Sequence, residues 1–399
     1  MDIPKTLACP AELIIEGDCR LAAGKLIAAR GLKRPLIVSD ATMESLGFLQ
    51  ELRSVLEAAS LIVASVMIRD DQEPTDVSIA PINQALADHQ ADVVIALGGG
   101  SVIDSSKAAV LLYEHSGTIR DYKFPAPIPS RRVPLYAVPT TAGTGSEATA
   151  ATVITDDATG EKLLIMGPAL VPDAALVDFR LSMTAPRRLT ADTGLDALTH
   201  AIEAFVSRKA TDDTDTVALE AMRELYKSIR RAYERADDVD ARASMMRAAT
   251  LAGIAFSNAS VALVHGMSRP IGAKFHVPHG LSNAMLLPAV TAFSLPNAMG
   301  RYADCARAMA VAPMEATDEE AAHELVSALQ SLGDTLAVPT LKEFGIDRDE
   351  FMSSLRSMSE QALASGSPGN NPRVATVDEM SRLYALIYDG AAIEDAMAL

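Results

Sequence analysis

The chain has 399 residues, 49% of them hydrophobic and 22% charged, and a formal net charge of −17 at pH 7. This length and composition predict a globular protein with a large core and more than one domain. The strong negative charge argues against a nucleic acid or an anionic membrane surface as a partner.

The N-terminal stretch MDIPKTLACP has no basic region followed by an apolar region, so it does not read as a secretory signal. No apolar run approaches the roughly 20 residues that span a bilayer. The three cysteines, Cys9, Cys19 and Cys305, form no CxxC pattern and are odd in number. A disulfide framework is therefore not expected, and we predict a protein of the reducing cytoplasm.

Short apolar runs alternate with amphipathic stretches through the first half of the chain. The apolar runs cover residues 35–40, 60–68, 91–101 and 133–141, and the clearest amphipathic stretches cover residues 43–59 and 77–89. Continuous runs rich in Val and Ile, separated by helical patterns, indicate a parallel sheet that helices cover on both faces. Residues 151–166 differ, because two strand-like runs flank a turn at Asp156, Asp157 and Gly160, as in a hairpin.

The character of the sequence changes near the middle of the chain. Long segments rich in Ala, Leu and Met dominate from Asp192 to the C-terminus, and β-branched runs become scarce. This pattern predicts an all-helical second half, interrupted by a loop at residues 365–373 and closed by a helix from about Val377. We therefore expect two domains, an α/β domain over residues 1–184 and a helical domain over residues 185–399.

Three consecutive glycines, Gly98, Gly99 and Gly100, lie between the third apolar run and a helical pattern. Glycine lets backbone N–H groups approach a phosphate closely, and a helix N-terminus adds partial positive charge. Ser101 follows at a place where it can either cap the helix or donate to a phosphate oxygen. The spacing is not the GxGxxG fingerprint, so a tight strand-to-helix turn without a ligand stays open as the alternative.

A second loop, residues 139–149, follows another apolar run and is rich in hydroxyl groups. Its Thr140, Thr141, Thr144 and Ser146 could donate to a pyrophosphate or a ribose. Two such loops, each at the carboxyl end of a parallel strand, indicate a nucleotide-binding crevice.

An acidic residue, Asp40, ends the first strong apolar run. A carboxylate at this place suits the two hydroxyls of a ribose and repels a 2′-phosphate, which would favour NAD over NADP. The residues alone leave an equal alternative, in which Asp40 caps the helix that follows it.

Asp196 and His200 are four residues apart in a helical pattern, and such residues lie on one side of a helix, where they can bind a single ion. His265 and His279 belong to a second stretch that holds three of the seven histidines, and each of these two precedes a glycine that gives access to its side chain. One carboxylate and neutral imidazoles suit Zn²⁺ or Fe²⁺. Taken singly, an Asp–His surface pair and two structural histidines are the alternatives.

Five motifs, read together, resemble the iron-containing (group III) alcohol dehydrogenase family. They are GGGSVIDSSKA, PTTAGTGSEAT, DTGLDALTHAIEAF, HGMSRPIGAKFHVPHGLSNAMLLP and NNPR, in the family's order and spacing from about residue 36 to residue 373. The resemblance implies an N-terminal Rossmann-like α/β domain with a mostly parallel sheet and an all-α C-terminal domain, a dehydroquinate synthase-like architecture. It also implies a divalent metal in the cleft between the two domains.

The resemblance assigns roles residue by residue. It implies that the metal, Fe²⁺ or alternatively Zn²⁺, is held by Asp196, His200, His265 and His279. It implies that the cofactor NAD is bound by Asp40, Gly98, Gly99, Gly100, Ser101, Thr140, Thr141, Thr144, Ser146 and Lys162, with Lys162 reaching the ribose on the nicotinamide side. Asp104 and Lys107 match the same motif without a defined contact, and Asp104 is counted among the cofactor-binding residues.

One position departs from the family's pattern. Family members often carry a second histidine four residues after His265, near the nicotinamide, where it can relay a proton. This chain has Arg269 there, and an arginine stays protonated near neutral pH, so it cannot serve as a relay. Arg269 could hold an anionic group of the substrate, or it could form a salt bridge or contact the phosphate or ribose of the cofactor.

The implied reaction is the reversible oxidation of a small alcohol to its aldehyde or ketone, with hydride transfer to NAD and a metal that acts as a Lewis acid. Glycerol dehydrogenase-like, maleylacetate reductase-like and dehydroquinate synthase-like enzymes are the alternatives, as is a nucleotide-binding protein without catalysis. The retained set of one aspartate and three histidines argues against the second and the last. A homodimer or larger homo-oligomer is usual for such relatives. The substrate, the metal and the oligomeric state stay open.

Overall fold

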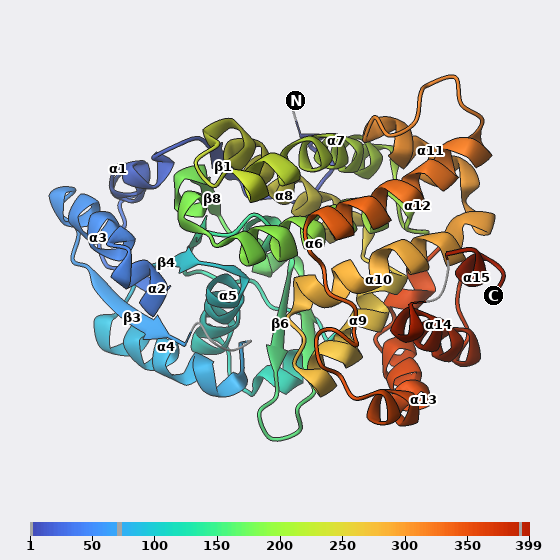
Figure 1. The fold of residues 1–399 in the computed structure, drawn as a ribbon. Helices are drawn as coiled ribbons and strands as arrows, with labels where there is room; N and C mark the ends of the chain where they lie inside the picture. Colours follow the sequence, from blue (N-terminus) through green and yellow to red (C-terminus); the bar gives the residue numbers. More distant parts are fainter. Residues whose placement is uncertain (1–2, 70–73, 391–392) are drawn as a thin grey trace. The chain divides into compact units, whose positions relative to one another are not determined.

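The computed structural model describes residues 3–69, 74–390 and 393–399. They form two compact units, Ala8–Ala185 and Pro186–Leu399, and the described residues before Ala8 belong to the second. The first unit combines a sheet with helices, and the second is built of helices (Figure 1). The predicted fold class, a mostly parallel sheet followed by an all-α half, is confirmed.

The first unit contains a six-stranded parallel sheet with the strand order β1-β8-β5-β4-β2-β3. The strands are β1 (Glu12–Ile15), β2 (Pro35–Asp40), β3 (Ala64–Ile68), β4 (Val93–Gly98), β5 (Leu135–Pro139) and β8 (Ala174–Val177). Across the centre, Val38 pairs with Ala96 and Ala96 pairs with Ala137. After β2 the chain moves outward to β3, and after β4 it moves the other way to β5, so the sheet has a switch point between β2 and β4.

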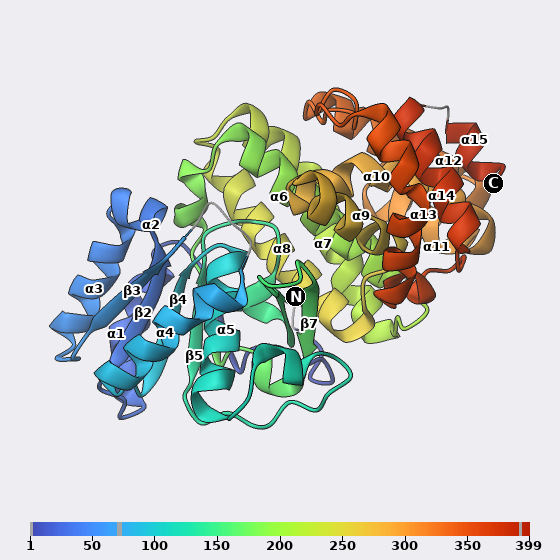
Figure 2. The same cartoon turned by 90° about the horizontal axis from the view of Figure 1, so that it is seen from below.

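Helices cover both faces of this sheet (Figure 2). One face carries α4 (Asp76–His89) and α5 (Gly100–Glu114), and the other carries α1 (Ala23–Ala29) and α3 (Phe48–Ala58). Val38 points to the first face and its neighbour Ile37 to the second. Because successive side chains of a strand alternate between faces and both faces are covered, the central strands are apolar at nearly every position. This burial on both faces explains the continuous apolar runs in the sequence.

The predicted hairpin is present as β6 (Ala151–Thr155) and β7 (Lys162–Met166), which pair antiparallel. Alternate side chains of the two strands, among them Ile154 and Leu163, are fully buried in the core beside α5. The hairpin is therefore anchored to the helix that follows the triple glycine.

Three details differ from the expectations. The strand predicted over residues 60–68 is shorter, because Ser60 adopts a φ of 62° in the turn after α3. The helix predicted over residues 43–59 is divided into α2 (Ala41–Ser45) and α3 at Gly47, whose φ of 81° lies in the left-handed region that favours glycine. Strands β1 and β8 were not predicted, since four residues each are too few to show a period.

The helical unit is organised around α6, most of whose side chains are buried. Its helices are α6 (Arg187–Val206), α7 (Asp212–Glu234), α8 (Val239–Ala259), α9 (Leu263–Phe275), α10 (His279–Ser294), α11 (Met299–Ala308), α12 (Asp318–Thr335), α13 (Arg348–Ala364), α14 (Val377–Asp389) and α15 (Ile393–Met397). A Cβ on Gly194 of α6 would lie 2.7 Å from Ile229 and Met245, so α7 and α8 approach this helix closely. Among the described residues, no single helix could span a membrane by length and apolarity; α8 and α9 meet that test only jointly, across a 104° bend.

Candidate metal centre and nucleotide-binding loops

The four side chains predicted to bind a metal converge in the helical unit. Asp196 and His200 come from α6, His265 from the first turn of α9 and His279 from the first position of α10. One ligand atom of each lies within 4.8 Å of the others. The distance from Nε2 to Asp196 Oδ1 is 3.9 Å for His200, 3.6 Å for His265 and 3.7 Å for His279. Residues that are 83 positions apart in the chain thus share one small site.

The donor set fits a divalent ion. Four ligands at about 2.1 Å from one tetrahedral ion would lie about 3.4 Å from one another, close to the observed separations. The amide nitrogen of Asn283 on α10 lies 2.7 Å from Asp196 Oδ1, 3.1 Å from His265 Nε2 and 3.3 Å from His279 Nε2. An amide has two hydrogens and cannot satisfy three acceptors, whereas a cation can. The buried Oδ1 of Asn283 has no hydrogen-bond partner among the described residues.

Electrostatics keep the aspartate ionised. Burial by itself would raise the pKa of Asp196, but the imidazoles, with His200 first, outweigh it and hold the pKa of this carboxyl well below its usual value. Burial by itself would lower the pKa of His265, but the charges and hydrogen bonds of Glu203 and Asp196, with the charge of Glu203 first, outweigh it and raise the pKa of His265. The site therefore offers an ionised carboxylate to a divalent ion near neutral pH.

Glu203 supports the candidate site and was not predicted from the sequence. Its carboxylate accepts hydrogen bonds from His265 Nδ1 at 2.6 Å and from the backbone N–H groups of Ala262 at 2.8 Å and Val264 at 2.5 Å. With its proton on Nδ1, the His265 ring presents the lone pair of Nε2 to the site. Glu203 follows His200 by three positions on the same buried helix, and this spacing was the available signal.

Arg269 lies one helical turn after His265 on α9. Its Nη1 donates to the hydroxyl of Ser367, at 3.0 Å, in the short 3-10 helix η7 (Ser367–Asn370). Among the described residues no carboxylate lies within ion-pair distance of it, so the salt bridge considered for this residue is not found there. Burial lowers the pKa of Arg269, and the charge of Glu203 only partly offsets this.

Most of the predicted nucleotide-binding residues lie at or after the carboxyl ends of β2, β4 and β5 in the first unit, whereas Lys162 begins β7 of the hairpin. A Cβ on Gly98, which ends β4, would lie 3.0 Å from Oδ2 of Asp40, which ends β2. A Cβ on Gly100 would lie 2.7 Å from the side chain of Thr144, and the N–H of Thr140 donates to Gly98 O at 3.1 Å. This cluster stands at the switch point of the sheet, where ligands of such folds bind.

Helix α5 presents its N-terminus at this cluster. Gly99 is its N-cap, and no side chain caps it. The capping role considered for Ser101 is therefore not realised, because Ser101 is already the second residue of the helix. The first N–H groups of a helix have no partner within it, and the helix dipole adds positive charge, so this end suits a phosphate. A Cβ on Gly99 would lie 3.6 Å from Thr141.

Asp40 caps a helix with one carboxylate oxygen, and its other oxygen lies at the predicted nucleotide-binding cluster; its contact with a ribose stays a prediction. Its Oδ1 accepts from the N–H of Met43 at 2.8 Å and so caps α2. Its Oδ2 lies beside Gly98, the last residue of β4. Capping one helix end uses one oxygen of the carboxylate, and its negative charge is retained at the site.

Asp104 and Lys107 of α5 hold the second loop in place. Asp104 accepts from Ser146 Oγ and, at 2.9 Å, from Val153 N. The Lys107 ammonium donates to Thr149 O, Thr149 Oγ1 and Ala151 O at 2.8 to 3.0 Å. Burial lowers the pKa of Lys107 to about 8 and raises that of Asp104. Asp104 thus organises the loop, while a direct contact of Asp104 or of the half-buried Lys162 with the cofactor stays a prediction.

Asp104→Asn is expected to raise the Kd for NADH about 5- to 10-fold, because an amide is a weaker acceptor for Ser146 and Val153 and the loop loses order. Fluorescence titration with NADH measures this, and metal content should be unchanged. Asp157→Asn, at an exposed turn of the hairpin, is the control. An unaltered Kd for Asp104→Asn would contradict the positioning role.

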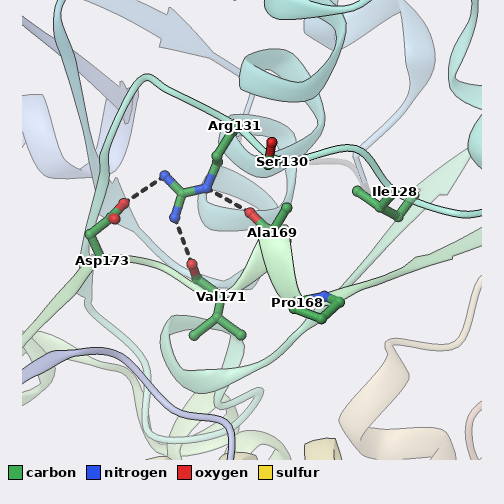
Figure 3. Close-up of a pocket in the computed structure, with 7 residues that line it drawn as sticks. All are labelled: Ile128, Ser130, Arg131, Pro168, Ala169, Val171 and Asp173. Atoms are coloured by element: carbon green, nitrogen blue, oxygen red, sulfur yellow. Dashed lines mark hydrogen bonds and ion pairs between the residues drawn. The ribbon is translucent and has the colours of Figure 1, made fainter.

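A surface hollow elsewhere in the first unit contains none of these residues (Figure 3). It is lined by Ile128, Ser130, Arg131, Pro168, Ala169, Val171 and Asp173. The Arg131 guanidinium donates to Ala169 O and Val171 O, both at 2.6 Å, and pairs with Asp173 at 2.6 Å. Because protein groups occupy this guanidinium, Arg131 ties two loops together and offers no binding site.

Known proteins share both parts of this arrangement. The family model for iron-containing alcohol dehydrogenase matches residues 10–179, and that for the C-terminal part of the Fe-containing alcohol dehydrogenase family matches residues 190–388. The NADPH-dependent butanol dehydrogenase of Clostridium saccharobutylicum is 36% identical over 369 residues, which are 92% of this chain and 94% of that protein. The NAD-dependent methanol dehydrogenase of Bacillus methanolicus is 32% identical over 94% of this chain and 97% of its own length.

The fold matches solved structures over nearly the whole chain. The crystal structure of a 1,3-propanediol oxidoreductase superposes with a TM-score of 0.91 at 29% identity, over 96% of this chain and 99% of that one. The two matched family regions contain the four converging ligands and the nucleotide-binding loops. The chain therefore belongs to the iron-containing (group III) alcohol dehydrogenase family and is an alcohol dehydrogenase, an oxidoreductase.

Proposed function

We propose that this dehydrogenase depends on a divalent metal, prefers NAD(H), and interconverts a small alcohol with its aldehyde or ketone. The observation that carries the proposal is the convergence of Asp196, His200, His265 and His279 in one site. When bound there, Fe²⁺, or alternatively Zn²⁺, supplies Lewis acidity, and the nicotinamide supplies or accepts the hydride. Identical ligands suit both metals, so the donor set does not choose between them.

The protein's own contribution is charge and orientation. One carboxylate and three imidazoles carry a single negative charge, less than the charge of a divalent ion, so positive charge is left for the substrate oxygen. Glu203 holds the His265 ring by its Nδ1 proton. Arg269 stays protonated, so we assign proton release to water and the ribose hydroxyls of the cofactor.

The test of the proposal is a panel of short primary alcohols and diols with the purified protein, NAD or NADP, and Fe²⁺ or Zn²⁺ in turn. Turnover that needs both a metal and a nicotinamide supports it. A preference for glycerol with Zn²⁺ would instead favour the glycerol dehydrogenase-like alternative. Reduction of an unsaturated keto acid would favour the maleylacetate reductase-like one, against which the four retained ligands argue.

Asp40→Gly is expected to shift cofactor choice, raising kcat/KM with NADP relative to NAD about 10-fold or more. The physical reason is the loss of a carboxylate that repels a 2′-phosphate. Glycine is tolerated at an N-cap at a cost of a few tenths of a kcal/mol, and Asp40→Ser keeps a capping oxygen without the charge. Kinetics with NAD and with NADP on the same preparations test this prediction. If the ratio of kcat/KM with NADP to kcat/KM with NAD is unchanged in both variants, Asp40 caps α2 but does not select the cofactor.

We further propose that the protein works in the cytoplasm as a homodimer or larger homo-oligomer. Cys9, Cys19 and Cys305 are all unpaired, which suits a reducing compartment. Burial raises the pKa of Cys19 to about 12, so this thiol is held in its unreactive form. Light scattering on the purified protein measures its oligomeric state, and a monomer at micromolar concentration would contradict the proposed homo-oligomer.

A further inference from the structure

We propose that Arg269, assisted by Ser367, binds the anionic group of a substrate that carries a carboxylate or sulfonate at the end remote from its alcohol or aldehyde carbon. The inference rests on the proposed function and adds the class of substrate to it. Arg269 would then be a residue that determines specificity.

Arg269 has a charge that no described residue neutralises. A guanidinium has five N–H donors, and the one hydrogen bond here runs to the neutral hydroxyl of Ser367, at 3.0 Å. Two other partly buried arginines of the helical unit are, by contrast, paired with a carboxylate: Arg301 lies 2.6 Å from Asp215 and Arg373 lies 2.9 Å from Glu379. A buried charge without a counter-ion is costly, so such a group is expected to serve a ligand.

The acidic group whose charge acts on Arg269 is already committed. Glu203 is that group, and its two oxygens accept three hydrogen bonds, one of them from the metal-site residue His265. Its charge therefore serves the imidazole that faces the metal site. The planar fork of Arg269 is left for an external carboxylate or sulfonate, which it can bind through two parallel hydrogen bonds.

The position of Arg269 suits a substrate whose other end is at the metal site. His265 and Arg269 are four residues apart on α9, so they lie on one side of the helix, about 6 Å apart along its axis. A Cβ on Gly266 would lie 2.6 Å from Pro368, so η7 is seated directly on α9 and fixes Ser367 beside the guanidinium. A short carbon chain spans such a separation.

The competing explanation is that Arg269 serves the cofactor. The first unit, however, already offers a pyrophosphate the N-terminus of α5 and the hydroxyl groups of the second loop. An extra cation is not required for that purpose. Removing the charge of Arg269 distinguishes the two explanations. If Arg269 binds the substrate, KM for an anionic substrate should rise; if it binds the cofactor, Kd for NADH should rise.

The experiment compares Arg269→Gln with the unaltered protein on two aldehydes of equal chain length, butanal and 4-oxobutanoate. We expect kcat/KM for 4-oxobutanoate to fall about 30- to 100-fold, mainly through KM, while that for butanal changes less than about 3-fold. Arg269→Lys should recover part of the loss, since it restores a charge without the fork. Arg356→Gln, which removes an exposed guanidinium on α13, should change neither.

Two binding measurements make the result independent of turnover. Calorimetric titration with butanoate, which cannot react, should show binding to the unaltered protein that Arg269→Gln weakens at least 10-fold. Fluorescence titration should give the same Kd for NADH in both. Equal losses on the two aldehydes, a raised Kd for NADH, or unchanged butanoate binding would each overturn the proposal. If neither aldehyde is turned over by the unaltered protein, the proposed function fails, and the butanoate titration still decides the role of Arg269.

Discussion

Replacing His265 or His279 by alanine is expected to lower kcat with any alcohol by at least about 10³-fold and to abolish tight metal binding. Either change leaves three donors, and Asn283 can then keep hydrogen bonds to the remaining acceptors that compete with the ion. The Kd for NADH should change less than about 3-fold, because the nucleotide-binding loops belong to the other compact unit.

Metal analysis, alcohol oxidation assays and NADH titration on the same preparations measure the three quantities. His323→Ala, a change to a half-buried histidine on α12, is the matched control and should retain metal and activity. Chelation of the unaltered protein should abolish turnover, and added Fe²⁺ or Zn²⁺ should restore it, but neither metal should rescue the alanine variants. A metal-free variant with full activity would contradict the assignment of all four ligands.

Glu203→Gln is expected to weaken metal binding about 10- to 100-fold although Glu203 does not belong to the ligand set. Glutamine has nearly the same shape, so packing is preserved, but it offers one acceptor oxygen to three N–H donors. The proton of His265 is then no longer held at Nδ1, and Nε2 is no longer reserved for the metal. The charge of Glu203 also helps to raise the pKa of His265, so this pKa should fall in the variant.

Competition with a chelator measures the affinity, and thermal unfolding with and without metal gives a second readout. A 10- to 100-fold weaker site loses about 1.4 to 2.7 kcal/mol of metal-induced stabilisation at a fixed, saturating metal concentration. A purely structural role would lower the stability of both forms alike and leave that difference unchanged. Glu220→Gln, a carboxylate on α7 that pairs with Arg223 at the surface, is the control.

The local parts of the site could be predicted because they follow from spacing within one element. Asp196 and His200 are four residues apart, and a helix brings such residues to one side whatever surrounds it. Gly98 to Gly100 could be placed between a strand and a helix because apolar periodicity locates both. The hairpin at residues 151–166 likewise follows from two runs and a turn signal.

The supporting residues could not be predicted in this way. Glu203 has the right spacing on α6, but its partners are the first residues of α9, and only packing shows that they meet. Asn283 lies on α10 and donates to Asp196 on α6, and only packing brings these two helices together. The sequence also left two interpretations of Asp40, a helix cap and a cofactor-binding carboxylate. In the structure one carboxylate oxygen caps α2 while the other lies beside Gly98.

The class of fold, the Asp196–His200 pair and the two loops could be predicted from the residues alone, because periodicity and short-range spacing are properties of single elements. The addition of His265 and His279 to that pair came from the family resemblance. Which side chains share a site depends on the tertiary structure, since Asp196 and His279 are 83 positions apart in the chain and meet only in the folded helical unit. The tertiary structure also shows that Arg269 donates to the neutral hydroxyl of Ser367 and has no carboxylate within ion-pair distance among the described residues. An arginine in a sequence carries no sign of whether a carboxylate neutralises it, because that depends on which residues the fold brings within a few ångströms of its guanidinium.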